Sequence, residues 1–169
     1  MAIPLNRLRA AALLKRDARV GTLHEARAKG QKAAFLCHSH QDKELVEGLD
    51  QILTSAGWNI YIDWRDADMP SRPNRETASK IQSRIKTADY FLFLATPRSV
   101  ASRWCPWEIG FADGVKALDR IFVVTTSDSA GSYGNEYLEL YRHIDFADDG
   151  LLAAWMPGKM TEGTLVRTL

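Results

Sequence analysis

The chain has 169 residues, of which 46% are hydrophobic and 25% charged, and a net charge of +1. This composition is that of a single globular domain, long enough to fold without a metal or disulfide staple. The longest apolar runs have the length of a strand, so the sequence predicts no membrane-spanning helix. The two cysteines, Cys37 and Cys105, match no metal-ligand spacing. They favour a reducing compartment, the cytoplasm, and a protein that holds no metal or cofactor.

Charge is unevenly distributed along the chain. Residues 1–32 contain eight Lys and Arg against two acids, and the remainder contains fourteen against nineteen. The body of the protein is therefore slightly acidic and has no general nucleic-acid footprint. Residues 1–31 are predicted to form a basic helical extension, broken at Gly21, ahead of a domain that spans residues 32–169. The extension places these apolar residues near one helical face: Leu5, Leu8, Ala12, Val20 and Leu23.

Beyond residue 31, short apolar runs alternate with amphipathic segments. The runs have the length of β-strands, and their unbroken apolar character is typical of strands that are covered on both faces. Strands are expected at residues 33–37, 58–62, 90–95 and 121–124, with a short fifth strand at 143–146.

Helices are expected between these strands. Residues 42–56 carry apolar side chains at i, i+3 and i+4 spacing, and Gly57 ends the pattern. The other expected segments are a charged loop at 63–75, a helix around 78–85, a helix from about 99 to 117, a loop at 127–135 and a tail of mixed helical character from 151. Strand–helix alternation predicts a doubly wound α/β fold, a parallel five-stranded sheet with helices on both faces. Its ligands should bind beyond the carboxyl ends of the strands.

Polar and aromatic residues gather at those carboxyl ends. The first strand runs into Cys-His-Ser-His-Gln-Asp at 37–42 and the second into Asp-Trp-Arg at 63–65. The third leads into a segment that contains Trp-Cys-Pro-Trp-Glu at 104–108. Because the carboxyl ends of parallel strands meet at one edge of the sheet, these segments are expected to line one crevice.

These three segments, in this order and spacing, resemble the Toll/interleukin-receptor (TIR) family over about residues 33–146. The resemblance implies a flavodoxin-like, five-stranded domain. Enzymatic TIR domains hydrolyse or cyclise NAD with the glutamate of a Trp-x-x-x-Glu motif, which here is Glu108. The sequences at 61–64, 104–110 and 134–138 look like those of stand-alone bacterial TIR proteins. Some of these act in antiphage systems of the Thoeris kind, where the TIR protein makes a signalling nucleotide that switches on a downstream effector.

The chemistry of a single carboxylate agrees with this role for Glu108. Breaking the bond between nicotinamide and ribose spreads positive charge over the ribose, and a neighbouring carboxylate stabilises that charge. The leaving group is a neutral pyridine, so no general acid is required and one carboxylate suffices. The alternative interpretation of Glu108 is an acid in the first turn of a helix, where the helix dipole favours it.

Three further residues around the crevice are candidates for binding NAD as substrate. Trp104 lies one helical turn before Glu108, where its indole could stack on a base, and core packing is the alternative. His38 and Ser39 could bond ribose or phosphate, whereas Ser39 could equally cap the following helix. Asp42 is expected to be structural, as a cap or in an ion pair.

The loop at 63–75 adds Trp64 and Arg65 as candidate substrate-binding residues. Arginines there could hold a pyrophosphate, and a solvated charged loop is the alternative. The resemblance also implies an aromatic residue near the end of this loop, but 75–78 reads Arg-Glu-Thr-Ala. Trp64 is the only aromatic residue within the loop that could substitute for it. A nucleophilic role for the Cys105 thiol is disfavoured, because no histidine lies near it in the sequence.

The sequence leaves two functions in competition. The first is an NAD glycohydrolase or ADP-ribosyl cyclase, and the second is a non-catalytic module that recruits other proteins. The presence of Glu108 favours the enzyme, because adaptors are free to replace it. The family resemblance also implies self-association through TIR–TIR contacts, with little activity expected in dilute protein. A phosphate-accepting receiver domain is excluded, since the acids it needs are replaced by His38, Ser39 and Thr96.

Overall fold

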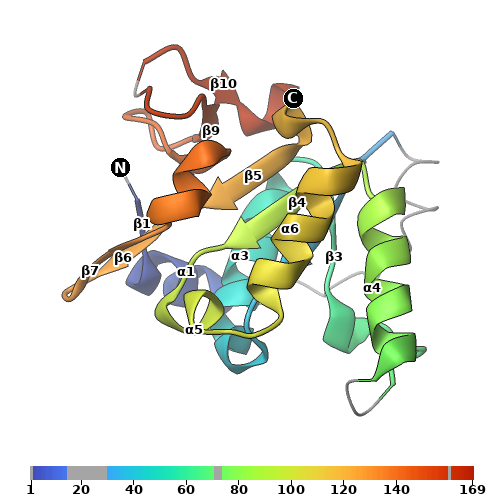
Figure 1. Cartoon of the computed structure of the whole chain (residues 1–169). Coiled ribbons are helices and arrows are strands. Elements are labelled where there is room, and N and C mark those ends of the chain that lie inside the picture. Colours follow the sequence, from blue (N-terminus) through green and yellow to red (C-terminus); the bar gives the residue numbers. More distant parts are fainter. Residues whose placement is uncertain (1, 15–29, 71–73, 160) are drawn as a thin grey trace.

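A computed structural model describes residues 2–14, 30–70, 74–159 and 161–169. At its centre lies a seven-stranded sheet in the order β10-β9-β8-β5-β4-β2-β3 (Figure 1). Five neighbouring strands run parallel: β3 (Trp58–Tyr61), β2 (Lys32–Cys37), β4 (Tyr90–Leu94), β5 (Ile121–Val124) and β8 (Arg142–Phe146). Numbered along the chain, they have the spatial order 2-1-3-4-5, which is the flavodoxin-like order. The predicted parallel five-stranded core is confirmed.

Helices cover both faces of the sheet, as predicted (Figure 1). On one face lie α1 (Leu5–Ala12) and α3 (Lys43–Ser55), and on the other lie α4 (Arg75–Thr87) and α6 (Cys105–Val115). Successive strand residues point to opposite faces, so each strand feeds two cores. Leu36 belongs to the core beneath α3, and its neighbour Phe35 belongs to the core beneath α6. This two-sided burial explains why the strands are apolar without interruption.

The helix predicted at 99–117 is wrong as a single element. The chain instead forms α5 (Pro97–Val100), a short break, and then α6. Pro106 lies in the first turn of α6 and has no N–H to continue a helix from α5. The Ser102 hydroxyl accepts hydrogen bonds from the backbone N–H groups of Trp104 at 3.1 Å and Cys105 at 3.4 Å. The break therefore starts a new helix just before Glu108.

The loop predicted at 127–135 is also partly wrong, because it contains a β-hairpin. Its strands are β6 (Thr126–Asp128) and β7 (Gly131–Tyr133), and β6 pairs in parallel with β1 (Ile3–Pro4). The Asp128 carboxylate accepts hydrogen bonds from the Ala130 N–H and the Tyr133 hydroxyl, which stabilise the turn. Serine and glycine favoured a loop locally, but the partner strand comes from the other end of the chain.

The N-terminal segment packs against the domain rather than standing apart from it. Leu8 on α1 is fully buried in the same core as α3. A Cβ atom built on Gly48 of α3 would lie 1.9 Å from the Leu8 carbonyl oxygen, so the two helices meet at backbone contact. Val20, Gly21 and Leu23 of the predicted extension lie outside the described residues. The domain boundary at residue 32 stays a prediction.

The C-terminal tail is strand where mixed helical character was expected. β9 (Leu152–Trp155) pairs antiparallel with β8, and β10 (Thr164–Leu165) pairs antiparallel with β9. Leucine and alanine favour helix weakly, and the open edge of β8 overrides that preference. After β10, the short helix η5 (Val166–Thr168) brings the Val166 carbonyl within 3.0 Å of the Trp58 indole nitrogen. None of the helices in the described part of the chain is long and apolar enough to span a bilayer.

Candidate active site

The candidate site lies at the carboxyl ends of β2 and β4. In the 2-1-3-4-5 order, these strands flank the point where the chain's winding reverses direction, which is where ligands of doubly wound folds bind. β2 ends at Cys37 and leads into His38, whereas β4 leads through Thr96 into α5 and α6. The topology thus brings the loop after the first strand and the Trp-Cys-Pro-Trp-Glu segment together, as the sequence predicted.

Asp42 holds the two loops of the crevice together. Its carboxylate is buried and accepts a hydrogen bond from the Thr96 hydroxyl at 2.5 Å. Arg98 on α5 approaches the other carboxylate oxygen at 3.3 Å and also donates to the Gln41 carbonyl. Thr96 and Ser99 form a reciprocal capping box at the start of α5. Asp42 is therefore structural, in keeping with the expectation from the sequence.

Glu108 is buried near the carboxyl ends of β2 and β4, with 6% of its surface exposed. It lies in the first turn of α6, and its N–H donates to the Trp104 carbonyl at 2.9 Å. Burial raises the pKa of Glu108 well above the usual carboxyl range, the Cys105 thiol adds to the rise, and a hydrogen bond with Cys37 opposes it. No lysine or arginine of the described residues forms an ion pair with this carboxyl. A titratable group with a raised pKa in a ligand-binding crevice is typical of functional carboxyls.

The two cysteines form the floor beside Glu108. Both are buried and free, and the Cys37 sulfur lies 3.8 Å from the Cys105 carbonyl oxygen. Burial raises the pKa of Cys37 well above the usual thiol range. A hydrogen bond with Cys37 lowers the pKa of Cys105, although burial opposes it. The two thiols therefore act on the pKa of Glu108 in opposite directions, and its burial is the main cause of the rise.

Aromatic side chains flank Glu108 on α6. Trp104 is half-buried, packs against the core under α6, and lies edge-on to Trp107 with ring centroids 5.5 Å apart. Trp107 is exposed and stacks on Phe111 at 6.2 Å. Its contact with the core agrees with the packing alternative, and its partial burial leaves part of the indole accessible. Its role in substrate binding stays a prediction.

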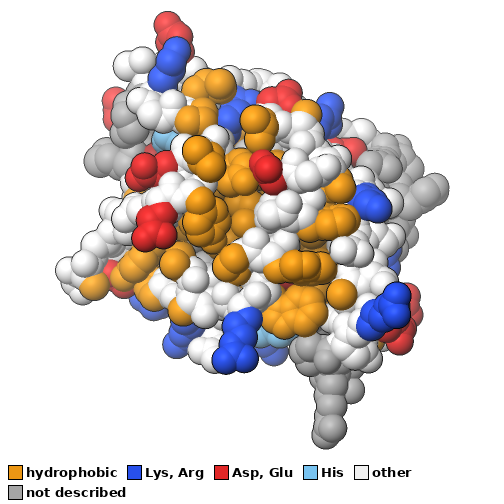
Figure 2. All heavy atoms as spheres, viewed as in Figure 1, with side chains coloured by type: hydrophobic (Ala, Val, Ile, Leu, Met, Phe, Trp, Pro, Cys, Tyr) orange, Lys and Arg blue, Asp and Glu red, His pale blue; other side chains and the backbone are white. Residues whose placement is uncertain are grey.

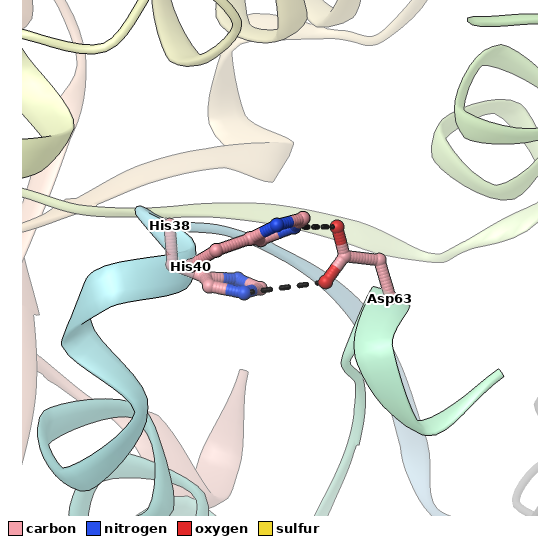
Figure 3. A group of neighbouring side chains, drawn as sticks. All are labelled: His38, His40 and Asp63. Carbon is pink, nitrogen blue, oxygen red and sulfur yellow. Dashed lines mark hydrogen bonds and ion pairs between the residues drawn. The ribbon is translucent and has the colours of Figure 1, made fainter. Parts of the chain in front are cut away.

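A second polar group lies at the carboxyl ends of β2 and β3. His38 and His40 point toward the Asp63 carboxylate from the opposite side (Figure 3). The His40 Nε2 lies 2.6 Å from one carboxylate oxygen, and the His38 Nε2 lies 3.3 Å from the other. Burial alone would raise the pKa of Asp63, but the two histidines outweigh it and hold that pKa well below its usual range. The hydrogen bond with Asp63 in turn raises the pKa of His40.

The other predicted substrate-binding residues are placed differently from one another. Trp64 packs edge-on against the His38 ring at 4.5 Å, so the structure brings these two together. Ser39 caps the short helix η1 (His40–Asp42) by accepting from the Gln41 N–H at 3.4 Å. Arg65 is paired with Asp50 on α3 at 2.6 Å. The roles proposed for Ser39, Trp64 and Arg65 in substrate binding stay predictions.

Sequence reasoning did not identify His40 and Asp63 as partners of His38. The available signal was a His-x-His spacing after one strand and an acid after its neighbour in the sheet. The Asp63 charge contributes to the raised pKa of Glu108, which places the two groups within electrostatic reach of each other. The crevice therefore combines one protonatable carboxyl on an apolar floor with an imidazole–carboxylate cluster beside it.

Comparison with known protein families identifies the class of protein. A family model described as a TIR domain matches residues 34–155. The chain belongs to the TIR-domain family, which confirms the resemblance drawn from the three motif segments.

Two curated relatives are more specific. A protein of Bacillus cereus (strain MSX-D12), named as a probable 3′ cyclic ADP-D-ribose synthase, ThsB′, is 34% identical over 113 residues, covering 65% of this chain and 58% of the relative. A protein of Cytobacillus dafuensis, named as a candidate cyclic ADP-D-ribose synthase, TIR2, is 24% identical over 99 residues, covering 57% of this chain and 26% of the relative. The chain thus spans less than two thirds of either relative's length.

Proposed function

We propose that this protein cleaves NAD at the bond between nicotinamide and ribose, with Glu108 as the catalytic residue. One observation carries the proposal: a carboxyl free of ion pairs among the described residues lies buried at the point of the sheet where doubly wound folds bind ligands. Membership of the TIR family and the names of both relatives support the same chemistry.

The proposed reaction begins with the loss of nicotinamide. The C–N bond breaks, its electron pair stays on the ring nitrogen, and neutral nicotinamide leaves an oxocarbenium-like ribose behind. The Glu108 carboxylate stabilises that positive charge across an apolar, water-poor contact. Water captures the cation to give ADP-ribose and a proton. Alternatively, a nucleophile of the same ADP-ribose molecule captures it and loses a proton, which gives a cyclic product.

The raised pKa of Glu108 matters for this chemistry, because only the ionised form can stabilise the cation. Burial favours the neutral form in the free protein. The nicotinamide ring of NAD carries a positive charge, and its arrival beside Glu108 favours ionisation. We therefore expect kcat/KM to rise with pH through the elevated pKa of Glu108 and to level off above it.

A cyclic product is the better-supported outcome, because both relatives are named as cyclic ADP-D-ribose synthases. Cys37 and Cys105 are buried beside Glu108, and we propose that they limit the access of water, so that an internal nucleophile competes for the cation. We further propose that the nucleotide serves as a signal to a downstream effector in antiphage defence.

The decisive experiment is incubation of the purified protein with NAD and analysis of the products by mass. We expect nicotinamide together with ADP-ribose or its cyclic isomer, and a loss of about 1000-fold or more in rate for Glu108→Gln. Glu76→Gln is the matched control, because Glu76 also lies in the first turn of a helix but is exposed. Equal rates for the parent and Glu108→Gln would refute the proposal.

Recruitment of further copies is the second candidate function, and an exposed apolar surface supports it. Hydrophobic side chains gather over the face of the molecule that carries α6 (Figure 2). Exposed members include Trp107 and Val115 on α6, and Tyr137 and Leu140 on the short helix η4 (Glu136–Leu140). Apolar patches of this kind typically mark association surfaces. We propose that copies of the chain associate here and that activity depends on it.

The two candidates are tested together by measuring specific activity across protein concentration. If association completes the site, specific activity falls on dilution and Leu140→Lys lowers activity at a given concentration. Leu13→Lys is the matched control for added charge, because Leu13 is also an exposed leucine but follows α1, on the other face of the sheet from α6. Constant specific activity at every dilution would leave NAD cleavage intact and remove the requirement for association.

A further inference from the structure

We propose that His38, His40 and Asp63 form a binding site for a divalent transition metal ion of the Zn²⁺ class. The three residues come from the loop after β2, from η1, and from the start of the short helix η2 (Asp63–Arg65). One ligand atom from each lies within 4.8 Å of the other two. Two imidazoles and one carboxylate are a common ligand set for Zn²⁺ and related metals. This inference does not depend on the proposed NAD chemistry.

The tautomer of His38 is the first argument. Its Nδ1 lies 2.8 Å from the Leu36 carbonyl oxygen, which can only accept, so Nδ1 carries the proton. In the neutral ring, Nε2 then presents a lone pair. That nitrogen is buried, has no well-formed hydrogen bond, and lies 3.3 Å from a carboxylate oxygen of Asp63. Two electron-rich atoms that face each other in a buried place need a cation between them, which is either a proton on Nε2 or a metal ion that takes the place of that proton.

The geometry is the second argument. With metal–ligand bonds of about 2.0–2.1 Å, the ligand atoms of a tetrahedral Zn²⁺ site lie about 3.4 Å apart. His38 and Asp63 already have this spacing, at 3.3 Å. The His40 Nε2 contacts the other oxygen of the same carboxylate, at 2.6 Å, and would have to leave that contact to bind an ion held between His38 and the first oxygen. Its side chain is 67% exposed, so it can move outward without disturbing the core.

The surroundings of the cluster are the third argument. The backbone N–H of Trp64 donates to a carboxylate oxygen of Asp63 at 2.7 Å, which orients the carboxylate. The Trp64 ring packs edge-on against His38, and the Leu36 carbonyl fixes the ring of His38 from behind. Supporting contacts of this kind hold metal ligands in place and raise affinity. An ion here would join the loops after β2 and β3 at the mouth of the crevice that holds Glu108.

The experiment uses the full chain without an affinity tag, stripped with a chelator and titrated with Zn²⁺ alone by calorimetry. We expect one Zn²⁺ per chain and a visible d–d spectrum of tetrahedral type when Co²⁺ replaces it. His40→Ala is the principal variant, because this exposed side chain can be removed without loss of folding. It should weaken Zn²⁺ binding by at least about 10-fold, and Asp63→Asn should weaken it further.

Matched variants separate this site from other sources of binding. His143→Gln removes a histidine from β8 and should leave the affinity unchanged, as should Cys105→Ser if no thiol takes part. Glu108→Gln should keep Zn²⁺ binding while losing NAD cleavage, so failure of one proposal is distinguishable from failure of the other. Absence of Zn²⁺ binding would overturn the inference and identify the cluster as an ion pair of protonated His38 with Asp63. Binding that survives both His40→Ala and Asp63→Asn would overturn it equally.

Discussion

The region around Glu108 and the contact of α1 with α3 around Leu8 (here called the corner) are both buried. The first encloses polar side chains, whereas the second encloses apolar ones. In the crevice, polar groups such as His38, Asp42 and Glu108 are enclosed. In the corner, α1 meets α3 through apolar side chains and a direct backbone contact at Gly48. Burying an ionisable carboxyl without a countercharge costs stability, whereas burying Leu8 adds it. The contact of α1 with α3 therefore stabilises the fold, whereas the buried carboxyl of Glu108 destabilises it, as is common for functional groups.

The largest effect on stability is expected in the corner. Gly48→Ala places a methyl group where the Leu8 carbonyl lies and pushes α1 off α3, so it should cost about 3 kcal/mol of unfolding free energy. Gly114→Ala on α6 is the control, since its added methyl group meets open space and should stabilise by about 0.5–1 kcal/mol. Urea denaturation measures both. Equal stability of Gly48→Ala and the parent would show that α1 is not docked in solution.

Next in size is the polar link that supports the crevice. Asp42→Ala leaves the Thr96 hydroxyl without its partner in a buried place and should cost about 2 kcal/mol. Arg98→Ala removes only the exposed partner of Asp42 and should cost less than about 1 kcal/mol. Thermal denaturation of the two variants compares them directly. A larger loss for Arg98→Ala than for Asp42→Ala would contradict the structural role assigned to Asp42.

The smallest expected effect on stability is a gain, not a loss. The pKa of Glu108 is raised in the folded protein above its ordinary value of 4.5, so its carboxyl contributes stability at low pH that is lost as pH rises toward the folded pKa. Glu108→Gln removes this loss and should be more stable than the parent by about 1 kcal/mol at pH 8. The difference should vanish below pH 4.5. A parent more stable than Glu108→Gln at pH 8 would show that the buried carboxyl does not destabilise the folded protein.

The parallel sheet was predictable because each of its strands is apolar on both faces, a local property of the sequence. The break between α5 and α6 was visible in principle, since Pro106 lies inside the apolar pattern at 99–117. The strands β6 and β9 were not predictable from local composition. Serine and glycine in the first and alanine in the second favour other structures, and only pairing with β1 and β8 makes them strands.

In the site, too, local motifs were predictable and contacts between distant segments were not. Glu108 was identified from its motif, and its place in the crevice follows from the order of β2 and β4 in the sheet. The cluster of His38 with Asp63 was missed because it depends on register. Phe35 pairs with Tyr61, so the residues just beyond each strand end become neighbours. No feature of either strand alone determines how far one slides along the other.

The contact between Trp58 and Val166 has a consequence for the timing of folding. Trp58 is fully buried at the β3 edge, and its indole donates to a carbonyl 108 positions further along the chain. β1 likewise pairs with β6, which lies more than a hundred residues later in the chain. Such distant pairings make folding slow, because the entropy of the intervening chain is lost before the stabilising contacts form. During synthesis, the Trp58 indole therefore stays without this partner until residue 166 has emerged from the ribosome.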